Sequence, residues 1–262
     1  MSSGSDPDLI KFLGTAGARF VVARQLRSSA GTFIRLDGAN IVLDPGPGTL
    51  VRLAKAKPAI DVTKLDAVIL SHLHIDHTND ANVLIDAMTS GGLNRRGALF
   101  APASCLEGDG AVVLKYLRGY LDTIEVLRAE KTCSVGGLSF TTSVAHDHGA
   151  ETYGVNFYRR GQTISFLVDT RYFPELQESY ADADILVMNV VRLAPHASGD
   201  VMHLCVDDAR EILQHVKPRI GVLTHFGMTM LRAKPWLVAQ RLSEELGLDV
   251  RAASDGMTLE LD

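Results

Sequence analysis

The fold of this chain is decided by the stretch AVILSHLHIDH, residues 67–77. Its first four residues are apolar and predict a buried strand. Three imidazoles and one carboxylate follow within six residues. One tetrahedral zinc cannot take all four from so tight a turn, whereas two ions can, and imidazole with carboxylate suits zinc, iron or manganese. The first ion would take His72 and His74, and the second Asp76 and His77.

The alternative is a polar loop in which histidines cluster by chance. Only nine of the 262 residues are His, which argues against a chance cluster. Two divalent ions about 3.5–4 Å apart need a bridging anion, and a hydroxide between them becomes a nucleophile near neutral pH. Asp169 suits the bridge because it directly ends an apolar run, although an Asp that caps a turn would look the same. The later β-branched runs with their following candidates are residues 141–145 with His146 and His148, residues 164–168 with Asp169, and residues 220–224 with His225.

These motifs in this order resemble the metallo-β-lactamase-fold hydrolases, and within them the ribonuclease Z-like phosphodiesterases. The resemblance extends from the Gly14-Thr15 turn to Gly227. It implies an α/β fold: a four-layer αβ/βα sandwich of two mixed β-sheets with helices outside and a metal site at one edge. It also implies the full ligand set, which is His72, His74 and a third His for the first ion, Asp76, His77 and His225 for the second, and Asp169 for both.

The third histidine of the first ion is either His146 or His148. In the ribonuclease Z-like branch this ligand stands six residues before the Gly of an aromatic-Gly pair. His148 has that spacing from Gly154 and His146 does not, so the resemblance favours His148. Alternation along an extended strand would place both side chains on one face, so we expect both to face the metals.

Two residues outside the ligand set are expected to support the site. Asp44 lies in a tight Gly- and Pro-rich turn, where its carboxylate can accept the N–H of a ligand His and fix its tautomer; a turn-forming Asp before Pro is the alternative. His203 resembles the His of a family His-Ser/Thr-x-x-x-Ala motif, with Leu204 in place of Ser/Thr. It would stabilise charge on a phosphoryl oxygen or, like Asp76, move a proton; a surface His beside a helix is the alternative.

The composition is that of an ordinary globular protein, with 46% hydrophobic and 22% charged residues. The formal net charge of -5 argues against a protein held to nucleic acid by overall charge. No apolar stretch is long enough to span a bilayer, and Met1 to Asp8 lack the apolar centre of a secretory signal. Three widely spaced cysteines form no zinc or disulfide pattern, so we expect a cytoplasmic protein. The sequence has no short repeat, low-complexity tract or linker, so we expect one domain, residues 1–262.

Apolar runs and turn residues predict alternating strands and helices along the chain. The segment that carries Arg19, Arg24 and Arg27 reads as a polar loop. Strands are predicted at residues 9–13, 31–36, 41–43, 67–70, 98–100, 141–145, 164–168, 220–224 and 257–261, and helices from residue 49 and at residues 79–88, 112–117, 206–216 and 235–246.

We therefore predict a hydrolase with two divalent ions, zinc or else manganese or iron, that acts on a small, cyclic phosphodiester. Hydrolysis of a lactone or thioester by the same ions is the alternative. A transfer-RNA 3′-processing nuclease is disfavoured, because residues 89–131 contain no basic, Gly/Pro-rich arm and a large RNA partner needs neutralised phosphates. A binding or sensor protein would not need seven ligands. The family also suggests a homodimer.

Overall fold

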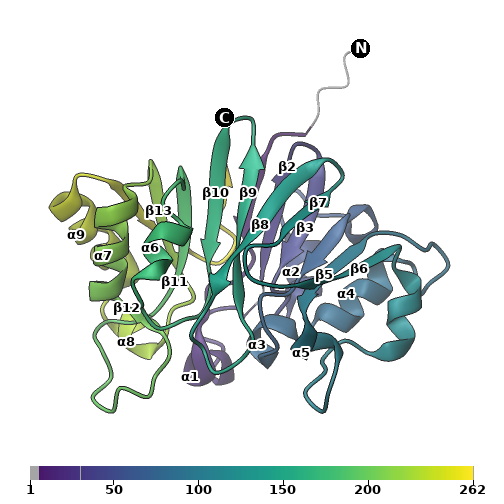
Figure 1. The fold of residues 1–262 in the computed structure, drawn as a ribbon, viewed down its shortest axis with the longest axis horizontal. Helices are drawn as coiled ribbons and strands as arrows, with labels where there is room; N and C mark the ends of the chain where they lie inside the picture. Colours follow the sequence, from purple (N-terminus) through teal and green to yellow (C-terminus); the bar gives the residue numbers. More distant parts are fainter. Residues whose placement is uncertain (1–5, 30, 262) are drawn as a thin grey trace.

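The computed structural model describes residues 6–29 and 31–261, so the start of the Ser- and Gly-rich terminus, residues 1–5, lies outside the described residues. Two β-sheets pack face to face at the centre of the molecule (Figure 1). Each sheet contains parallel and antiparallel pairs. In pairing order, the first sheet is β15 (Thr258–Glu260), β1 (Leu9–Phe12), β2 (Thr32–Leu36), β3 (Ala39–Leu43), β4 (Ala67–Ile69), β5 (Ala98–Pro102) and β6 (Thr123–Leu127).

The second sheet places its parallel strands next to one another, which brings their carboxyl ends to the same edge. A short strand, β12 (Leu204–Cys205), pairs with β11 beside the main path. In pairing order, this sheet is β14 (Asp249–Ala252), β13 (Ile220–Thr224), β11 (Ile185–Arg192), β10 (Gln162–Leu167), β9 (Tyr153–Arg159), β8 (Leu138–Ala145) and β7 (Thr132–Val135).

Helices cover the outer face of each sheet (Figure 1). The first sheet is covered by α2 (Thr49–Lys55) and α4 (Ala81–Met88), and the second by α6 (Glu175–Ser179), α7 (Val206–Val216) and α9 (Pro235–Leu246). The predicted four-layer sandwich is therefore confirmed. The remaining helices are α1 (Ala18–Ala23), α3 (Ile75–Thr78), α5 (Ala103–Leu106), α8 (Met228–Arg232) and the 3-10 helices η1 (Val62–Lys64) and η2 (Lys115–Tyr120).

Strand alternation explains how the sheets have two apolar faces. In β2, Ile34 points into the core between the sheets, whereas Phe33 packs under the helices of the first sheet. In β13, Val222 faces the core between the sheets and Leu223 faces α7 and α9. Strands buried on both faces read as continuous apolar runs, which is why residues 67–70 and 220–224 were recognisable in the sequence.

Two predicted elements are wrong. The segment with Arg19 and Arg24 is not simply a loop, because residues 18–23 form α1, held by the fully buried Val21. The helix predicted at residues 112–117 is instead the 3-10 helix η2, which begins three residues later at Lys115. Among the described residues, no helix is long and apolar enough to cross a membrane.

Candidate metal centre

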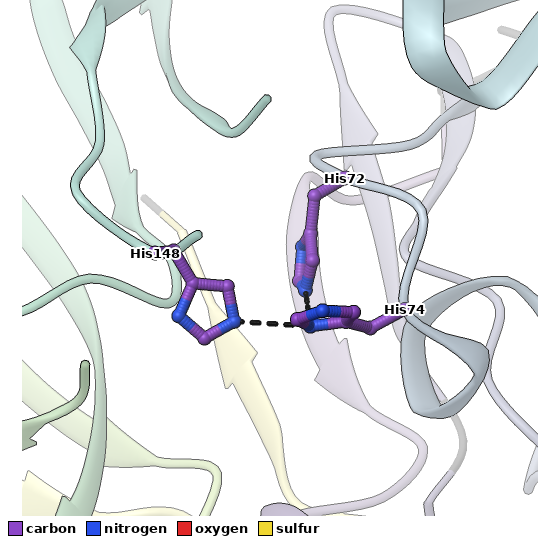
Figure 2. Close-up of side chains that lie close together, drawn as sticks. All are labelled: His72, His74 and His148. Carbon is purple, nitrogen blue, oxygen red and sulfur yellow. Dashed lines mark hydrogen bonds between the residues drawn. The ribbon is translucent and has the colours of Figure 1, made fainter. Parts of the chain in front are cut away.

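The candidate ligands are presented by segments that directly or closely follow strand ends, on both sheets. The strand β4 of the first sheet leads into residues 71–77, while β10 and β13 of the second lead into Asp169 and His225. His148 follows β8 and reaches the same place from the side opposite to His72 and His74 (Figure 2). The site therefore forms where the two sheets meet.

Three ring nitrogens converge in the first cluster. The Nε2 atom of His72 lies 3.0 Å from Nδ1 of His74, and Nε2 of His148 lies 3.1 Å from the same Nδ1 atom (Figure 2). Two nitrogens bound tetrahedrally to one zinc at 2.0–2.1 Å lie about 3.3 Å apart. The three imidazoles thus have the spacing of ligands of a shared ion.

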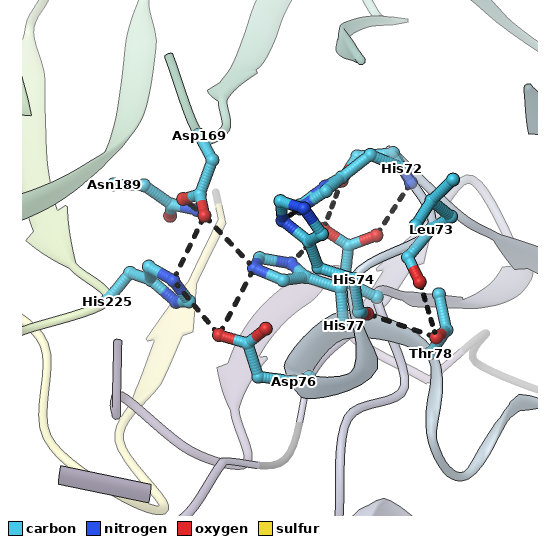
Figure 3. Close-up of polar contacts among 12 residues, drawn as sticks. His72, Leu73, His74, Asp76, His77, Thr78, Asp169, Asn189 and His225 are labelled. Carbon is cyan, nitrogen blue, oxygen red and sulfur yellow. Dashed lines mark hydrogen bonds and ion pairs between the residues drawn. The ribbon is translucent and has the colours of Figure 1, made fainter. Parts of the chain in front are cut away.

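The second cluster contains Asp76, His77 and His225, and Figure 3 shows Asp169 beside His77 and His225. One oxygen of Asp76, Oδ2, is 3.8 Å from Nε2 of both His77 and His225. The Oδ2 atom of Asp169 is 3.3 Å from those two nitrogens and 3.5 Å from Nε2 of His148. Asp169 is thus the carboxylate that touches both clusters, as a bridging residue must.

The far nitrogens of three imidazoles are held by fixed partners. Asp44 Oδ2 accepts a hydrogen bond from Nδ1 of His77 at 2.9 Å, and the Met202 carbonyl accepts one from Nδ1 of His148 at 2.8 Å. The Ser71 hydroxyl lies 2.9 Å from Nδ1 of His72 and donates to Asp44. Such contacts orient ligand imidazoles and fix their tautomers.

Sequence reasoning identified Asp44 and missed three other supporting groups. Besides Ser71 and the Met202 carbonyl, Asn189 on β11 donates from Nδ2 to Oδ1 of Asp169 at 2.8 Å (Figure 3). Neither Asn189 nor Met202 lies near a ligand in the sequence. Ser71 directly precedes the histidine cluster, and that adjacency was the one signal available.

The site contains buried nitrogen atoms without partners, as expected of a binding site for metal ions. Among the described residues, Nε2 of His77 and of His225 and Nδ1 of His203 are buried without a hydrogen-bond partner. Buried polar atoms rarely stay unpaired, and a cation among them would take up their lone pairs. The donor set of imidazole nitrogen and carboxylate oxygen suits zinc, iron or manganese.

Opposite charges are concentrated among these largely buried side chains. Burial lowers the pKa of the His72 imidazole well below its ordinary value and lowers that of His74 as well. Burial alone would also lower the pKa of His77, but the carboxylates of Asp169 and Asp44 outweigh it and raise that pKa well above the ordinary value. Asp169 behaves in the reverse way, because the neighbouring histidines outweigh its burial and hold its pKa well below the usual range.

His146 lies outside both clusters. Its Nε2 atom is 2.9 Å from the Tyr180 hydroxyl and its Nδ1 atom is 3.2 Å from the backbone oxygen of Asp169. The expectation that His146 and His148 both face the metals is wrong for His146, because β8 ends at Ala145 and strand alternation does not extend to the residues after it. The geometry places His148 alone in the ligand cluster.

His203 lies beside the clusters rather than on the open surface. Its Nδ1 atom is 3.7 Å from Oδ2 of Asp169, and its ring centre is 4.8 Å from that of His148. Burial, partly opposed by Asp169, lowers the pKa of His203 to about 4. A neutral imidazole still donates one ring N–H.

Close backbone packing fixes the positions of the ligand segments. A Cβ atom on Gly46 would lie 1.9 Å from the backbone oxygen of Asp76, and one on Gly17 would lie 2.1 Å from that of His225. His225 itself has a φ of 58°, which is uncommon for a residue other than glycine. Backbone strain of this kind gathers at functional sites.

A cavity of about 800 Å³ opens beside the first cluster, and His74, His148 and His203 form part of its wall. Its volume is that of a site for a small organic molecule. The cavity gives a substrate access to the imidazoles that the clusters bring together.

Comparisons with known proteins agree with this architecture. The family described as the Beta-lactamase superfamily domain matches residues 39–226. "Uncharacterized protein MJ1374" of Methanocaldococcus jannaschii is 30% identical over 96% of this chain and 94% of its own length. A ribonuclease Z of Kineococcus radiotolerans is 24% identical, with coverages of 94% and 89%. The crystal structure of the metallo-beta-lactamase fold protein YhfI from Bacillus subtilis superposes with a TM-score of 0.81 at 19% identity, over 98% of this chain and 100% of that one.

Proposed function

This chain belongs to the beta-lactamase superfamily, and from that premise we propose that it is a dinuclear metal-dependent hydrolase of small phosphodiesters. The observation that carries the proposal is the position of Asp169, whose Oδ2 atom lies within 3.5 Å of histidines from both clusters. A scaffold without catalysis has no need for a carboxylate shared by two such clusters.

The proposed ligands divide between the two clusters. His72, His74 and His148 hold the first ion, Asp76, His77 and His225 hold the second, and Asp169 touches both. When bound, two such ions lower the pKa of a water molecule and offset the negative charge of a phosphoryl group. Zinc is the ion we expect, with manganese and iron as alternatives of the same chemistry.

The residues around the ions then hold and orient the reacting groups. Asp44 keeps the proton of His77 on Nδ1, so that Nε2 presents its lone pair to the second cluster. Asp76, in the same cluster, accepts a proton from the attacking water. His203, on the wall of the cavity, donates a ring N–H to a phosphoryl oxygen or to the leaving oxygen of the substrate.

Two observations support a phosphodiester over a lactone or thioester, and a third supports a small diester over a large RNA. His203 stands where a non-bridging phosphoryl oxygen would need a donor, which a carbonyl substrate does not demand. A relative aligned over 94% of the chain is a ribonuclease Z, and ribonucleases act on phosphodiesters. The size of the cavity and the net charge of -5 favour a small diester, such as a cyclic one, over a large RNA.

The test is hydrolysis of bis(p-nitrophenyl) phosphate by protein that is stripped of metal and then reloaded. We expect turnover that disappears with the metal and returns with it. His203→Ala should lower this turnover about 10²-fold or more while the metal content is unchanged. Protein that holds two ions but cleaves only lactones or thioesters, with His203→Ala fully active on them, would refute the phosphodiester proposal.

A further inference from the structure

The cavity beside the first cluster has a strongly cationic wall. Four arginines line it: Arg19 and Arg24 on and just after α1, Arg192 at the end of β11, and Arg232 at the end of α8. Among the described residues on this wall, Asp200 carries the one carboxylate. A chain with a net charge of -5 thus concentrates positive charge at the entrance to its own site.

The guanidinium groups of these four arginines are largely unpaired. Within the described residues, the side chains of Arg19, Arg24 and Arg232 form no hydrogen bond or ion pair, and Arg192 donates from Nε to a backbone carbonyl at 3.2 Å. Like charges that share a cavity repel one another until an anion enters. The guanidinium groups are therefore free to bind one.

Two further arginines, Arg95 and Arg96, show the contrast. Arg95 lies 3.9 Å from a carboxylate oxygen of Asp122, and Arg96 lies 3.5 Å from one of Asp66. Neither lines the cavity. The sequence alone could not separate these paired arginines from the unpaired ones.

An apolar surface lies among the arginines of the cavity. Phe20 on α1 lines the wall with 67% of its surface exposed, together with Val191 and Met228. A large exposed aromatic ring at a cavity is a surface on which a planar or apolar part of a ligand packs. The wall therefore suits a molecule with an uncharged middle part and a charged end.

We propose that Arg19, Arg24, Arg192 and Arg232 form a subsite for a second phosphate group of the substrate, distinct from the group that is cleaved. The cleaved diester lies at the His74, His148 and His203 end of the cavity, so this inference rests on the proposed function. Four guanidinium groups against one carboxylate exceed what a single carboxylate of a ligand would balance, whereas a phosphate dianion with its three acceptor oxygens suits them. The substrate class is a small phosphodiester that bears a phosphate monoester.

The kinetic test uses two substrates that differ by one phosphate. These are thymidine 5′-(p-nitrophenyl phosphate) and the same compound with a 3′-phosphate, both of which release p-nitrophenol. We expect metal-loaded protein to prefer the second by about 10-fold or more in kcat/KM, mainly through KM, since guanidinium groups form charge-assisted hydrogen bonds with phosphate. The preference should shrink as salt concentration rises.

Arginine variants locate the preference, and Arg27→Gln is the matched control, because Arg27 lies in the same segment but not on the cavity wall. Arg19→Gln and Arg232→Gln should each bring the ratio of the two kcat/KM values towards one, whereas Arg27→Gln should keep the ratio of the unchanged protein. Equal kcat/KM values in the unchanged protein, or a preference that survives Arg19→Gln combined with Arg232→Gln, would overturn the inference.

A binding measurement separates this inference from the proposed function. Calorimetry with thymidine 3′,5′-bisphosphate and thymidine 5′-monophosphate should show the same preference and the same effect of the variants, whether or not either diester is cleaved. If neither diester is cleaved but the bisphosphate binds more tightly through the arginines, the phosphodiesterase proposal fails and the phosphate subsite stands. If both diesters are cleaved but the two nucleotides bind equally, the subsite fails alone.

Discussion

The carboxylate of Asp44 lies 2.9 Å from Nδ1 of His77 and reaches across 33 residues of sequence to do so. A carboxylate has no proton to donate and can only accept hydrogen bonds, so Nδ1 of His77 carries the proton of this contact. The Nε2 atom of His77 thereby faces Asp76 and Asp169, where the proposed second ion would bind it. The same carboxylate accepts from the backbone N and the hydroxyl of Ser71, each at 2.7 Å, so one turn orients both ends of the histidine segment.

Asp44→Asn should weaken metal binding. Asparagine tolerates the left-handed backbone of this position, where φ is 52°, but has one accepting oxygen instead of two for three donors. We expect the affinity for zinc to fall 10–100-fold, as measured by competition with a chromogenic chelator. Asp61→Asn, at an exposed turn, is the control. Equal affinities of the two variants would mean that Asp44 only shapes its turn.

Asp76→Ala should remove one ion and leave the other. Asp76 belongs to the second cluster, while the three imidazoles of the first cluster do not depend on it. Elemental analysis should show about one zinc per chain instead of two, and turnover should be lost with an unchanged circular dichroism spectrum. Asp86→Ala, on an exposed position of α4, should keep both ions and full turnover. Full activity of Asp76→Ala would contradict the two-ion mechanism.

Two histidine variants distinguish ligand from support. His148→Ala removes a nitrogen from the first cluster and should lower the zinc content, whereas His146→Gln should keep it. His146 instead joins the Tyr180 hydroxyl to the backbone of Asp169, so its variant should lower the free energy of unfolding by about 1–3 kcal/mol. Elemental analysis and urea unfolding measure the two effects. Loss of zinc from the His146 variant and not from the other would reverse the assignment.

Gly46→Ala should disturb the second cluster from outside it. Its new methyl group would lie 1.9 Å from the backbone oxygen of Asp76 and 2.2 Å from that of Ser29, so one of these backbones must move. We expect a loss of about 1–3 kcal/mol in the free energy of unfolding and a weaker second ion. Gly119→Ala is the matched control, because nothing lies within 4 Å of its added Cβ atom. Equal stability and zinc content in both variants would contradict the packing described.

The three buried cysteines should resist thiol reagents until the chain unfolds. Burial raises the pKa of the Cys105 thiol to about 12 and the pKa values of Cys133 and Cys205 to about 11, from an ordinary 9.0. The folded state therefore keeps protons that the unfolded chain loses above pH 9, and stability falls as the pH rises from there towards 11–12. A disulfide reagent at about pH 8 should titrate three thiols only in denaturant. Rapid reaction of the folded protein would show that the thiols are accessible.

Local signals in the sequence predicted the elements that are buried on both sides or have clear ends. The helices at residues 206–216 and 235–246 and the strand at residues 220–224 have the predicted bounds, because each is a clear apolar stripe or run, and Pro218 follows the first helix. The helix α1 was missed because six residues are too few for a periodic signal, and its position depends on Val21 packing into the core.

The candidate site also has residues that the sequence predicts and contacts that it does not. The seven ligand candidates were found because each follows a recognisable strand within a few residues. The roles of Asn189 and the Met202 carbonyl depend on contacts between segments far apart in the chain, which a single sequence does not contain. The separation of His146 from His148 depends on where β8 ends, at Ala145, whereas pattern reasoning continues the strand through both histidines.

The division of the ligands between the two sheets has a consequence for how the protein is made. His72, His74, Asp76 and His77 leave the ribosome first, but His148, Asp169 and His225 come from the second sheet and are synthesised much later. A growing chain that has been made as far as β6 lacks only β15 of its first sheet but still holds incomplete sets of ligands. The proposed ligand sets are therefore complete only after His225 has been made, and an ion bound to them would connect the two sheets.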